Sequence, residues 1–595
     1  MRASRLLAII ITLQSKGSMT AQSLAERFEV SRRTIYRDLD ELSAAGIPIR
    51  ADRGVGGGIT LSGDYRTDLS GLTTEEAAAF SLNGLPELAS QLGIAAAAAG
   101  ARVKLMHALG GHAAKLANQS VPGRNLFCLP LLLLLVACAD SRHADTAGEL
   151  ALAACEIAGD DTALCGTLQV PENWNNKSGR MLDLNVVILP ATGTATEPPL
   201  IDLAGGPGLA ATGGAAWYVT DGAAWRQNRD IILFDQRGTG DSAPAHCPEV
   251  GDASTLSPMY PLELVRECVR KLGETHDLSR YSSVSAMRDI EAIRDALDAE
   301  QIDLFGMSYG TRLAQAYIRG YPRRVRAAAF IGAVSMDGKS PLSHARNAES
   351  ALQAIFEDCE RDARCASTFP DLRSEWESLH DLLQQSQLVA DTGNGRKVIE
   401  PGPFMEAFRT LLILPSGQRA VPALIAELSA GDTKRFLDMI DGSGPSLFAE
   451  GTYLSIECTE STNRIDATEI DAAAANTFLG RYRVDDQLRA CSVWPETDVP
   501  ESFFEPVVSD VPLLLLAGGR DHTVPAEHAN SIAKGFRNSR LVIVEEMGHV
   551  PDAISNLECL DRIMLDFFEA PLASLESGCV HDMRAPPFDV PTDTG

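Results

Sequence analysis

Short, almost wholly apolar runs recur along the chain from about residue 180 onward. They predict strands at 182–189, 200–203, 231–235, 302–305, 327–332, 511–517 and 541–544. Continuous apolar runs of this length are typical of parallel strands that are buried on both faces. A helical pattern at 284–297 lies between two of the runs, so the elements alternate as in an α/β protein.

The strand-like runs stop between about residues 340 and 504, where helical patterns take over. We expect this stretch to be a mainly helical cap that is inserted between the later strands of the sheet.

Residues 1–66 carry a different pattern, of three short helices and then a Gly-rich turn at 54–58 between two β-type runs. In the third helix, Ile35, Leu39 and Leu42 recur at helical spacing and should face a core. Off that stripe, near the helix start, lie the side chains that we expect to contact DNA: Arg32, Arg33, Thr34, Tyr36 and Arg37. The turn predicts a β-wing. A basic three-helix bundle without a DNA role is the alternative.

The charge is unevenly distributed along the 595 residues, which are too many for a single hydrophobic core. Residues 1–66 carry 10 Lys and Arg against 7 Asp and Glu, whereas the whole chain has a net charge of -28. A body that acidic does not bind nucleic acid through its general field, so only the first segment is suited to DNA.

Twelve cysteines are many for a cytosolic enzyme, and ten of them lie between Cys155 and Cys579. They show no paired CxxC spacing, so we predict no metal site. An even number predicts disulfides formed outside the cytoplasm, although scattered buried thiols are the alternative. The simplest pairing joins each cysteine to its neighbour in the chain: Cys155/Cys165, Cys247/Cys268, Cys359/Cys365, Cys458/Cys491 and Cys559/Cys579.

A short apolar segment at 126–137 is preceded by Lys115 and Arg124 and ends in small residues before Cys138. A basic flank, a short apolar run and small residues are typical of an export signal peptide. The run is too short for a comfortable membrane span, which needs about 20 residues. The alternative, a buried core helix, is disfavoured by Pro130.

A nucleophilic serine is predicted at Ser308, in Gly306-Met307-Ser308-Tyr309-Gly310. This G-x-S-x-G sequence lies between a predicted strand and a predicted helix, as a nucleophile elbow requires. The main-chain N–H of Tyr309 would then donate to an oxyanion. Serine needs a base that an acid holds in place, in the chain order Ser, Asp, His.

Downstream, Asp521 and His549 each follow a predicted strand and complete that order. His522 is the competing base, but it precedes its own strand and would break the order. Upstream, Leu203-Ala204-Gly205-Gly206-Pro207-Gly208 also follows a strand, and we expect the N–H of Gly206 to be the second oxyanion donor. Asp235 and Arg237 should brace the loop beside the site. This chemistry needs no cofactor.

Five motifs, GGPG, DQRGTGDS, GMSYG, GGRDHTVP and GHV, occur in this order. Together they resemble the proline iminopeptidase and tripeptidyl aminopeptidase group of α/β-hydrolases over residues 150–580, and the cysteines and export signal resemble the secreted tripeptidyl aminopeptidase branch. One departure is Ala204, where many proline iminopeptidases have His. In that group acidic cap residues hold the free N-terminus of the substrate. Glu457 and Glu460 are the candidates here, although solvated cap carboxylates are an equal alternative.

The N-terminal part, VSRRTIYRDLDELSAAGIPI with its Gly-rich wing, resembles the winged helix-turn-helix of WYL-type (YafY-like, DeoR-related) regulators over residues 1–110. The sensor domain that follows in that family is absent from the pattern. Leu-Val-Ala-Cys resembles a bacterial lipobox, with Cys138 as the lipidated residue. Because Met106 lies about thirty residues upstream, we expect that two neighbouring reading frames have been joined.

The predicted fold class is an α/β-hydrolase fold with a mainly helical cap, preceded by a small winged helix-turn-helix domain. The predicted domains are 1–66 (winged helix-turn-helix), 67–114 (helical connector), 115–149 (signal and linker), 150–339 (hydrolase core, first part), 340–505 (cap), and 506–582 (core, second part) with a tail to 595.

The predicted function is an exported serine aminopeptidase that acts on peptides with a free N-terminus. Duplex DNA would bind residues 1–66, and a lipid on Cys138 would bind the membrane. The alternatives are an esterase with the same triad and a membrane-tethered DNA-binding regulator with a hydrolase-like sensor.

Overall fold

The computed structural model describes residues 20, 24, 35, 39, 49–51, 59–61, 148, 150–385, 388–392, 395–441 and 448–591. The chain divides into two compact units, residues 1–138 and residues 139–595. Each unit is described by itself.

In the first unit, Ile35 and Leu39 of the predicted helical stripe are buried, and so is Leu24; Leu42, the third residue of the stripe, lies outside the described residues. Strand β1 (Ile49–Ala51) pairs antiparallel with β2 (Ile59–Leu61), which confirms the predicted β-wing. The five predicted DNA contacts and the predicted lipidation site at Cys138 lie outside the described residues.

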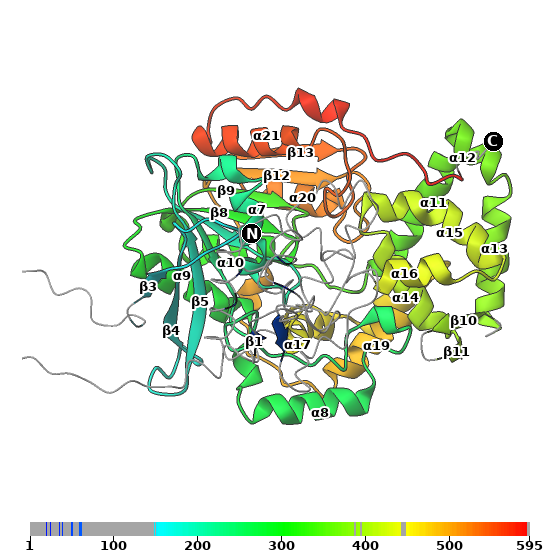
Figure 1. Ribbon diagram of the computed structural model, residues 1–595, viewed down its shortest axis with the longest axis horizontal. Helices are drawn as coiled ribbons and strands as arrows, with labels where there is room; N and C mark the ends of the chain where they lie inside the picture. Colours follow the sequence, from blue (N-terminus) through cyan, green and yellow to red (C-terminus); the bar gives the residue numbers. More distant parts are fainter. Residues whose placement is uncertain are drawn as a thin grey trace, which may run out of the picture. The chain divides into compact units, whose positions relative to one another are not determined.

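A nine-stranded sheet forms the centre of the second unit, in the order β13-β12-β9-β8-β6-β7-β5-β4-β3 (Figure 1). The strands from β13 to β7 run parallel, and β5, β4 and β3 continue the sheet antiparallel. Their bounds are β3 Ala151–Ala154, β4 Leu164–Pro171, β5 Met181–Leu189, β6 Leu200–Leu203, β7 Ile231–Phe234, β8 Ile302–Met307, β9 Val325–Ile331, β12 Leu513–Gly518 and β13 Ser539–Val544.

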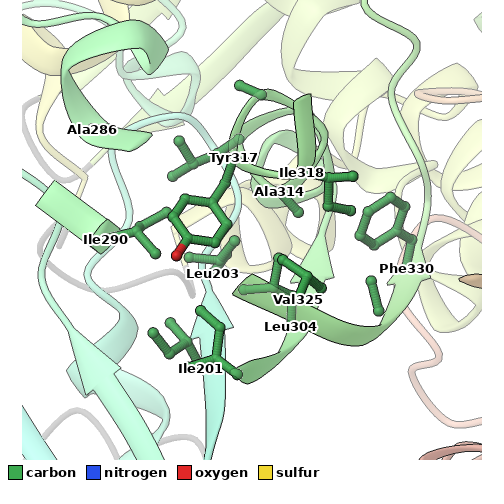
Figure 2. Packing of buried hydrophobic residues seen from close by; sticks show 14 of the residues in the cluster. Ile201, Leu203, Ala286, Ile290, Leu304, Ala314, Tyr317, Ile318, Val325 and Phe330 are labelled. Carbon is green, nitrogen blue, oxygen red and sulfur yellow. The ribbon is translucent and has the colours of Figure 1, made fainter. Parts of the chain in front are cut away.

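Helices cover both faces of this sheet. Leu513 and Leu515 of β12 belong to the core on one face, and Leu514 and Leu516 belong to the core on the other. The first face is covered by α9 (Ser283–Ala296), α10 (Tyr309–Gly320) and α20 (Ala526–Ala533), and the second by α7 (Ala215–Val219) and α21 (Glu558–Glu569). Figure 2 shows side chains of β6, β8 and β9 packed against α9 and α10. Burial on both faces explains the continuous apolar runs.

The cap lies in the chain between β9 and β12. Its helices are α11 His344–Arg361, α12 Ala363–Thr368, α13 Leu372–Gln384, α14 Pro401–Leu411, α15 Pro415–Ser429, α16 Lys434–Asp441, α17 Glu450–Glu460, α18 Ala467–Ala474 and α19 Tyr482–Cys491. Helices α11 to α16 gather on the right in Figure 1. A short hairpin of β10 (Val389–Thr392) and β11 (Gly395–Val398) interrupts the helices, so the cap is mainly helical, as predicted, but includes two strands that the sequence pattern did not indicate.

The seven predicted strands are confirmed, with ends that differ by at most about two residues. Two strands of the nine-stranded sheet were missed, β3 and β4. Strand β4 alternates between exposed and buried positions in its second half, and most of β3 is exposed, because both belong to the antiparallel edge. Such strands lack the continuous apolar run by which the others were recognised.

In the described part of the chain, five disulfides join ten cysteines, each to its neighbour along the chain, as predicted: Cys155–Cys165, Cys247–Cys268, Cys359–Cys365, Cys458–Cys491 and Cys559–Cys579. Among the residues that the structure describes, no helix combines the length and apolar character needed to span a bilayer.

Candidate active site

Ser308 occupies a strained turn between β8 and α10. Its φ of 54° and ψ of -123° lie in a region that residues with a side chain rarely adopt. The N–H of Ser308 donates to the carbonyl of Ile331 on the neighbouring strand, 3.0 Å away. A Cβ on Gly310 would lie 1.9 Å from the carbonyl oxygen of Leu203, so only glycine lets α10 approach β6 this closely. The predicted elbow is therefore present, with Ser308 at its apex.

Asp521 and His549 are in direct contact, each after its own strand. The Nδ1 of His549 donates to Oδ2 of Asp521 over 2.7 Å, and both side chains are buried. The other carboxylate oxygen, Oδ1, accepts from the N–H groups of Thr523 (2.9 Å) and Val524 (2.8 Å). These bonds orient the carboxylate, and the carboxylate in turn orients the imidazole and leaves its Nε2 free to act as a base.

Gly332 links the serine to the histidine, and sequence reasoning missed it. It follows Ile331, whose carbonyl holds the N–H of Ser308. A Cβ on Gly332 would lie 2.9 Å from Cε1 of His549 and 3.5 Å from Oδ2 of Asp521. Its φ of 59° also favours glycine. The end of β9 thus brings Ser308 and the Asp521–His549 pair to one place at the carboxyl edge of the sheet, where ligand sites of α/β folds lie.

The predicted oxyanion loop lies against the serine. A Cβ on Gly205 would approach the Cβ of Ser308 to 3.3 Å. Gly206 has a φ of 111°, which glycine adopts readily. The structure therefore brings together Ser308, Asp521, His549 and the loop that carries Gly206.

His522, the competing base, has a different environment. It is 3 % exposed, and neither ring nitrogen makes a well-formed hydrogen bond within the described part of the chain. Burial lowers the pKa of His522 well below its usual value, and the charge of Arg409 lowers it further. No carboxylate among the described residues orients its ring, so His549 is the better placed base.

The two cap carboxylates lie on α17 and differ in their contacts. Both oxygens of Glu460 are used: Oε1 accepts from the N–H of Ser283 (2.7 Å) and Oε2 from its hydroxyl (2.8 Å). Oε2 of Glu457 is buried without a hydrogen-bond partner among the described residues. Burial raises the pKa of Glu457 to about 7, against the opposing effect of the Arg312 charge. A buried carboxylate with an unused oxygen is suited to a cationic ligand.

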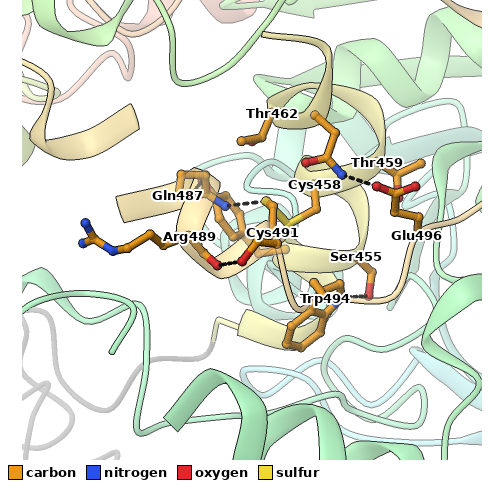
Figure 3. The surroundings of a disulfide bond; sticks show 12 residues. Ser455, Cys458, Thr459, Thr462, Gln487, Arg489, Cys491, Trp494 and Glu496 are labelled. Atoms are coloured by element: carbon orange, nitrogen blue, oxygen red, sulfur yellow. Dashed lines mark hydrogen bonds between the residues drawn. A yellow bond between two sulfur atoms is a disulfide. The ribbon is translucent and has the colours of Figure 1, made fainter. Parts of the chain in front are cut away.

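Helix α17 is tied firmly to its neighbours. The disulfide Cys458–Cys491 joins it to α19, directly beside Glu457 in the chain (Figure 3). The indole N–H of Trp494 donates to Oγ of Ser455 over 2.9 Å. These links restrict where the carboxylate of Glu457 can move.

Asp235 and Arg237 of the DQRGTGDS segment have structural contacts. Oδ1 of Asp235 accepts from the hydroxyl of Thr212 at 2.7 Å, and Oδ2 accepts from Asn185 at 2.9 Å. Arg237 forms two 2.6 Å bonds to Asp289, and both side chains are wholly buried. The expectation that Asp235 and Arg237 brace the loop is confirmed. In the described part of the chain, no group of three or more His, Cys, Asp or Glu side chains is arranged to hold a metal ion.

Two family profiles match the chain. The profile for the alpha/beta hydrolase fold matches residues 198–551, and that for an HTH domain matches residues 5–59. The second match agrees with the wing and with the buried stripe of the first unit.

Curated relatives match the two parts separately. Serine protease Hip1 of Mycobacterium tuberculosis is 26% identical over 433 residues, which cover 64% of this chain and 80% of that protein. Tripeptidyl aminopeptidase of Streptomyces coelicolor is 23% identical over 435 residues, 64% of this chain and 76% of that protein. The HTH-type transcriptional regulator YobV of Bacillus subtilis is 49% identical over 76 residues, 13% of this chain and 24% of that protein.

Proposed function

The chain belongs to the α/β-hydrolase family, and on that premise we propose that it is a serine aminopeptidase. Ser308 is the nucleophile, His549 the general base and Asp521 the residue that orients the base. The observation that carries the proposal is the 2.7 Å contact between His549 and Asp521, which Gly332 brings next to the elbow of Ser308.

The chemistry follows from these positions. His549 Nε2 takes the proton of Ser308 as Oγ attacks the peptide carbonyl, and the negative charge moves to the carbonyl oxygen. The N–H groups of Tyr309 and Gly206 stabilise that oxyanion. His549 then protonates the leaving amine, the C–N bond breaks, and water hydrolyses the acyl-enzyme by the same route in reverse.

Recognition of a free N-terminus falls to Glu457 in this proposal. Its buried, unpaired oxygen would accept from the substrate ammonium group, and the peptidase names of two relatives favour a peptide over a simple ester. Because both oxygens of Glu460 are already engaged with Ser283, the contacts favour Glu457 over Glu460 as the amine ligand.

The test compares a tripeptide p-nitroanilide that has a free amine with its N-acetylated form. An aminopeptidase cleaves the first and loses most of its kcat/KM on the second. Equal rates on both peptides would contradict recognition of a free N-terminus, and turnover of p-nitrophenyl acetate with cleavage of neither peptide would favour the esterase alternative.

We propose that the hydrolase part works outside the cytoplasm. The five disulfides support this location, because disulfides persist in oxidising compartments. A lipid on Cys138 would attach this part to the membrane. Intact mass of the native protein from fractionated cells tests both points: a chain that begins at lipidated Cys138 supports them, and a cytoplasmic chain that begins at Met1 contradicts them.

We propose that residues 1–66 bind duplex DNA through Arg32, Arg33, Thr34, Tyr36 and Arg37. The helix-turn-helix profile and the likeness to YobV support this assignment. They also favour the second candidate function, a membrane-tethered regulator, if one native chain contains both parts. Fluorescence anisotropy of the full chain with duplex DNA, at two salt concentrations, should show salt-sensitive binding that Arg33→Ala weakens.

A further inference from the structure

A chain of buried hydrogen bonds connects the cap to the residue that follows Ser308. Nε2 of Gln236 donates to the hydroxyl of Tyr309 over 3.2 Å, and that hydroxyl lies 2.8 Å from Oγ of Ser283. The hydroxyl of Ser283 then donates to Oε2 of Glu460 over 2.8 Å. All four residues are buried, and Glu460 and Ser283 are wholly inaccessible to solvent.

The carboxylate of Glu460 determines the direction of every bond in this chain. The hydroxyl of Ser283 gives its one proton to Oε2 of Glu460, which is the direction that an accepting carboxylate oxygen requires. Oγ of Ser283 can then only accept from Tyr309, which in turn accepts from Gln236. Bonds aligned in one direction polarise and strengthen one another.

This chain of hydrogen bonds joins three helices at their ends. Glu460 is the last residue of α17, Ser283 is the first of α9, and Tyr309 is the first of α10. Arg312 makes a second link, because its guanidinium donates to the carbonyl of Glu460 over 3.1 Å. The end of α17 is therefore held against the helix that begins at the nucleophile elbow.

We propose that Glu460 is a positioning residue for the oxyanion hole. Its carboxylate fixes the hydroxyl of Tyr309 through Ser283, and the fixed side chain holds the main-chain N–H of Tyr309 where the oxyanion forms. This inference rests on the proposed nucleophile, Ser308. It differs from a role for Glu460 in binding the substrate amine, because it acts on the chemical step for every substrate.

The test measures kcat and KM of Glu460→Gln on two substrates, the free tripeptide p-nitroanilide and p-nitrophenyl acetate. Gln presents an N–H group at a position where a carboxylate oxygen accepted a hydrogen bond, so the hydrogen bonds from Gln236 to residue 460 no longer all point the same way. We expect kcat to fall by about tenfold to a hundredfold on both substrates with little change in KM, somewhat less than the 10²–10³ that follows removal of an oxyanion donor. Ser283→Ala and Tyr309→Phe should reproduce this loss.

A double variant and a matched control separate positioning from general damage. If the residues act as one chain, Glu460→Gln combined with Tyr309→Phe loses no more kcat than the worse single variant. The control is Asp303→Asn. Asp303 is also a buried carboxylate, but it pairs with Arg229 at the start of β8, the end away from Ser308. The substitution should lower thermal stability but leave kcat of the folded enzyme within about twofold.

Four results would overturn the proposal. They are an unchanged kcat in Glu460→Gln, a rise in KM restricted to the free-amine substrate, additive losses in the double variant, and an equal kcat loss in Asp303→Asn. If Glu460→Gln does not fold, Ser283→Ala and Tyr309→Phe decide by the same criteria. Activity that persists in Ser308→Ala refutes the proposed function itself, and this inference with it.

Discussion

Glu457→Gln tests how the enzyme recognises a free N-terminus. The side chain is 7 % exposed, and its Oε2 has no hydrogen-bond partner in the described part of the chain. Gln keeps the shape of the side chain but removes the charge that would hold an ammonium group. The loss should therefore be confined to substrates with a free amine.

The size of this loss follows from the kind of bond removed. Hydrogen bonds to charged groups contribute about 1.5–3 kcal/mol, which corresponds to about tenfold to 150-fold in kcat/KM. We expect that reduction for the free tripeptide p-nitroanilide and no change for p-nitrophenyl acetate. The matched control is Glu450→Gln on the same helix, where the buried carboxylate already accepts from the N–H of Cys247 at 3.1 Å.

The same residue predicts a pH dependence. Burial raises the pKa of Glu457 to about 7, so the carboxylate becomes charged as the pH rises through 7. The substrate amine loses its proton near pH 7.7–8.0, so attraction weakens above that range. Dividing kcat/KM of the peptide by that of the acetate removes the pH dependence of the catalytic steps that both reactions share. The ratio should rise through about pH 7 and fall again above about pH 8.

The assay is a set of initial rates from pH 5.5 to 9 for the unsubstituted enzyme, Glu457→Gln and Glu450→Gln. In Glu457→Gln the rise near pH 7 should disappear. A ratio that is flat with pH in the unsubstituted enzyme, or an equal loss on both substrates in Glu457→Gln, would refute the assignment of Glu457 as the amine ligand.

Three further predictions follow from the contacts. Gly332→Ala places a Cβ 2.9 Å from Cε1 of His549 and should lower kcat at least about tenfold, because the rate falls steeply when the base is displaced. A kcat within twofold of that of the unsubstituted enzyme would show that the glycine is not needed. In Asp521→Asn the amide cannot stabilise the imidazolium of His549, so kcat should fall by about 10⁴ while thermal unfolding still shows a folded protein. A fall in kcat of less than tenfold would contradict the role of Asp521. Folding raises the pKa of Glu457 from 4.5 to about 7, so the folded state binds the proton more tightly, and this contribution to the free energy of unfolding is present at low pH and lost as the pH rises from 4.5 to 7. Urea unfolding at pH 5 and pH 8 should therefore show that Glu457→Gln removes up to about 3 kcal/mol of the pH dependence of the unfolding free energy. An unchanged pH dependence in Glu457→Gln would contradict the raised pKa.

The parts of the site that are local in sequence were predictable. The elbow at Ser308 and the positions of Asp521 and His549 depend on a strand and the turn after it, and both leave clear signals in the chain. The pairing of cysteines was also predictable, because each partner is the nearest one along the chain.

The parts that depend on distant segments were not predictable. Gly332 is one of 49 glycines, and its role exists only because β8, β9, β12 and β13 end at the same edge. The hydrogen-bond network that runs from Gln236 to Glu460 includes direct partners that are 177 positions apart, Ser283 and Glu460. Glu457 and Glu460 look equivalent in sequence, and only their hydrogen-bond partners distinguish them.

Turnover by Ser308→Ala is the most direct test of the account. The purified variant should keep the thermal unfolding midpoint of the unsubstituted protein and lose essentially all hydrolysis of the free tripeptide p-nitroanilide, on the order of 10³-fold or more. Hydrolysis retained at more than about a tenth of the original rate would mean that another residue is the nucleophile, and it would contradict the mechanism proposed for Ser308, His549 and Asp521.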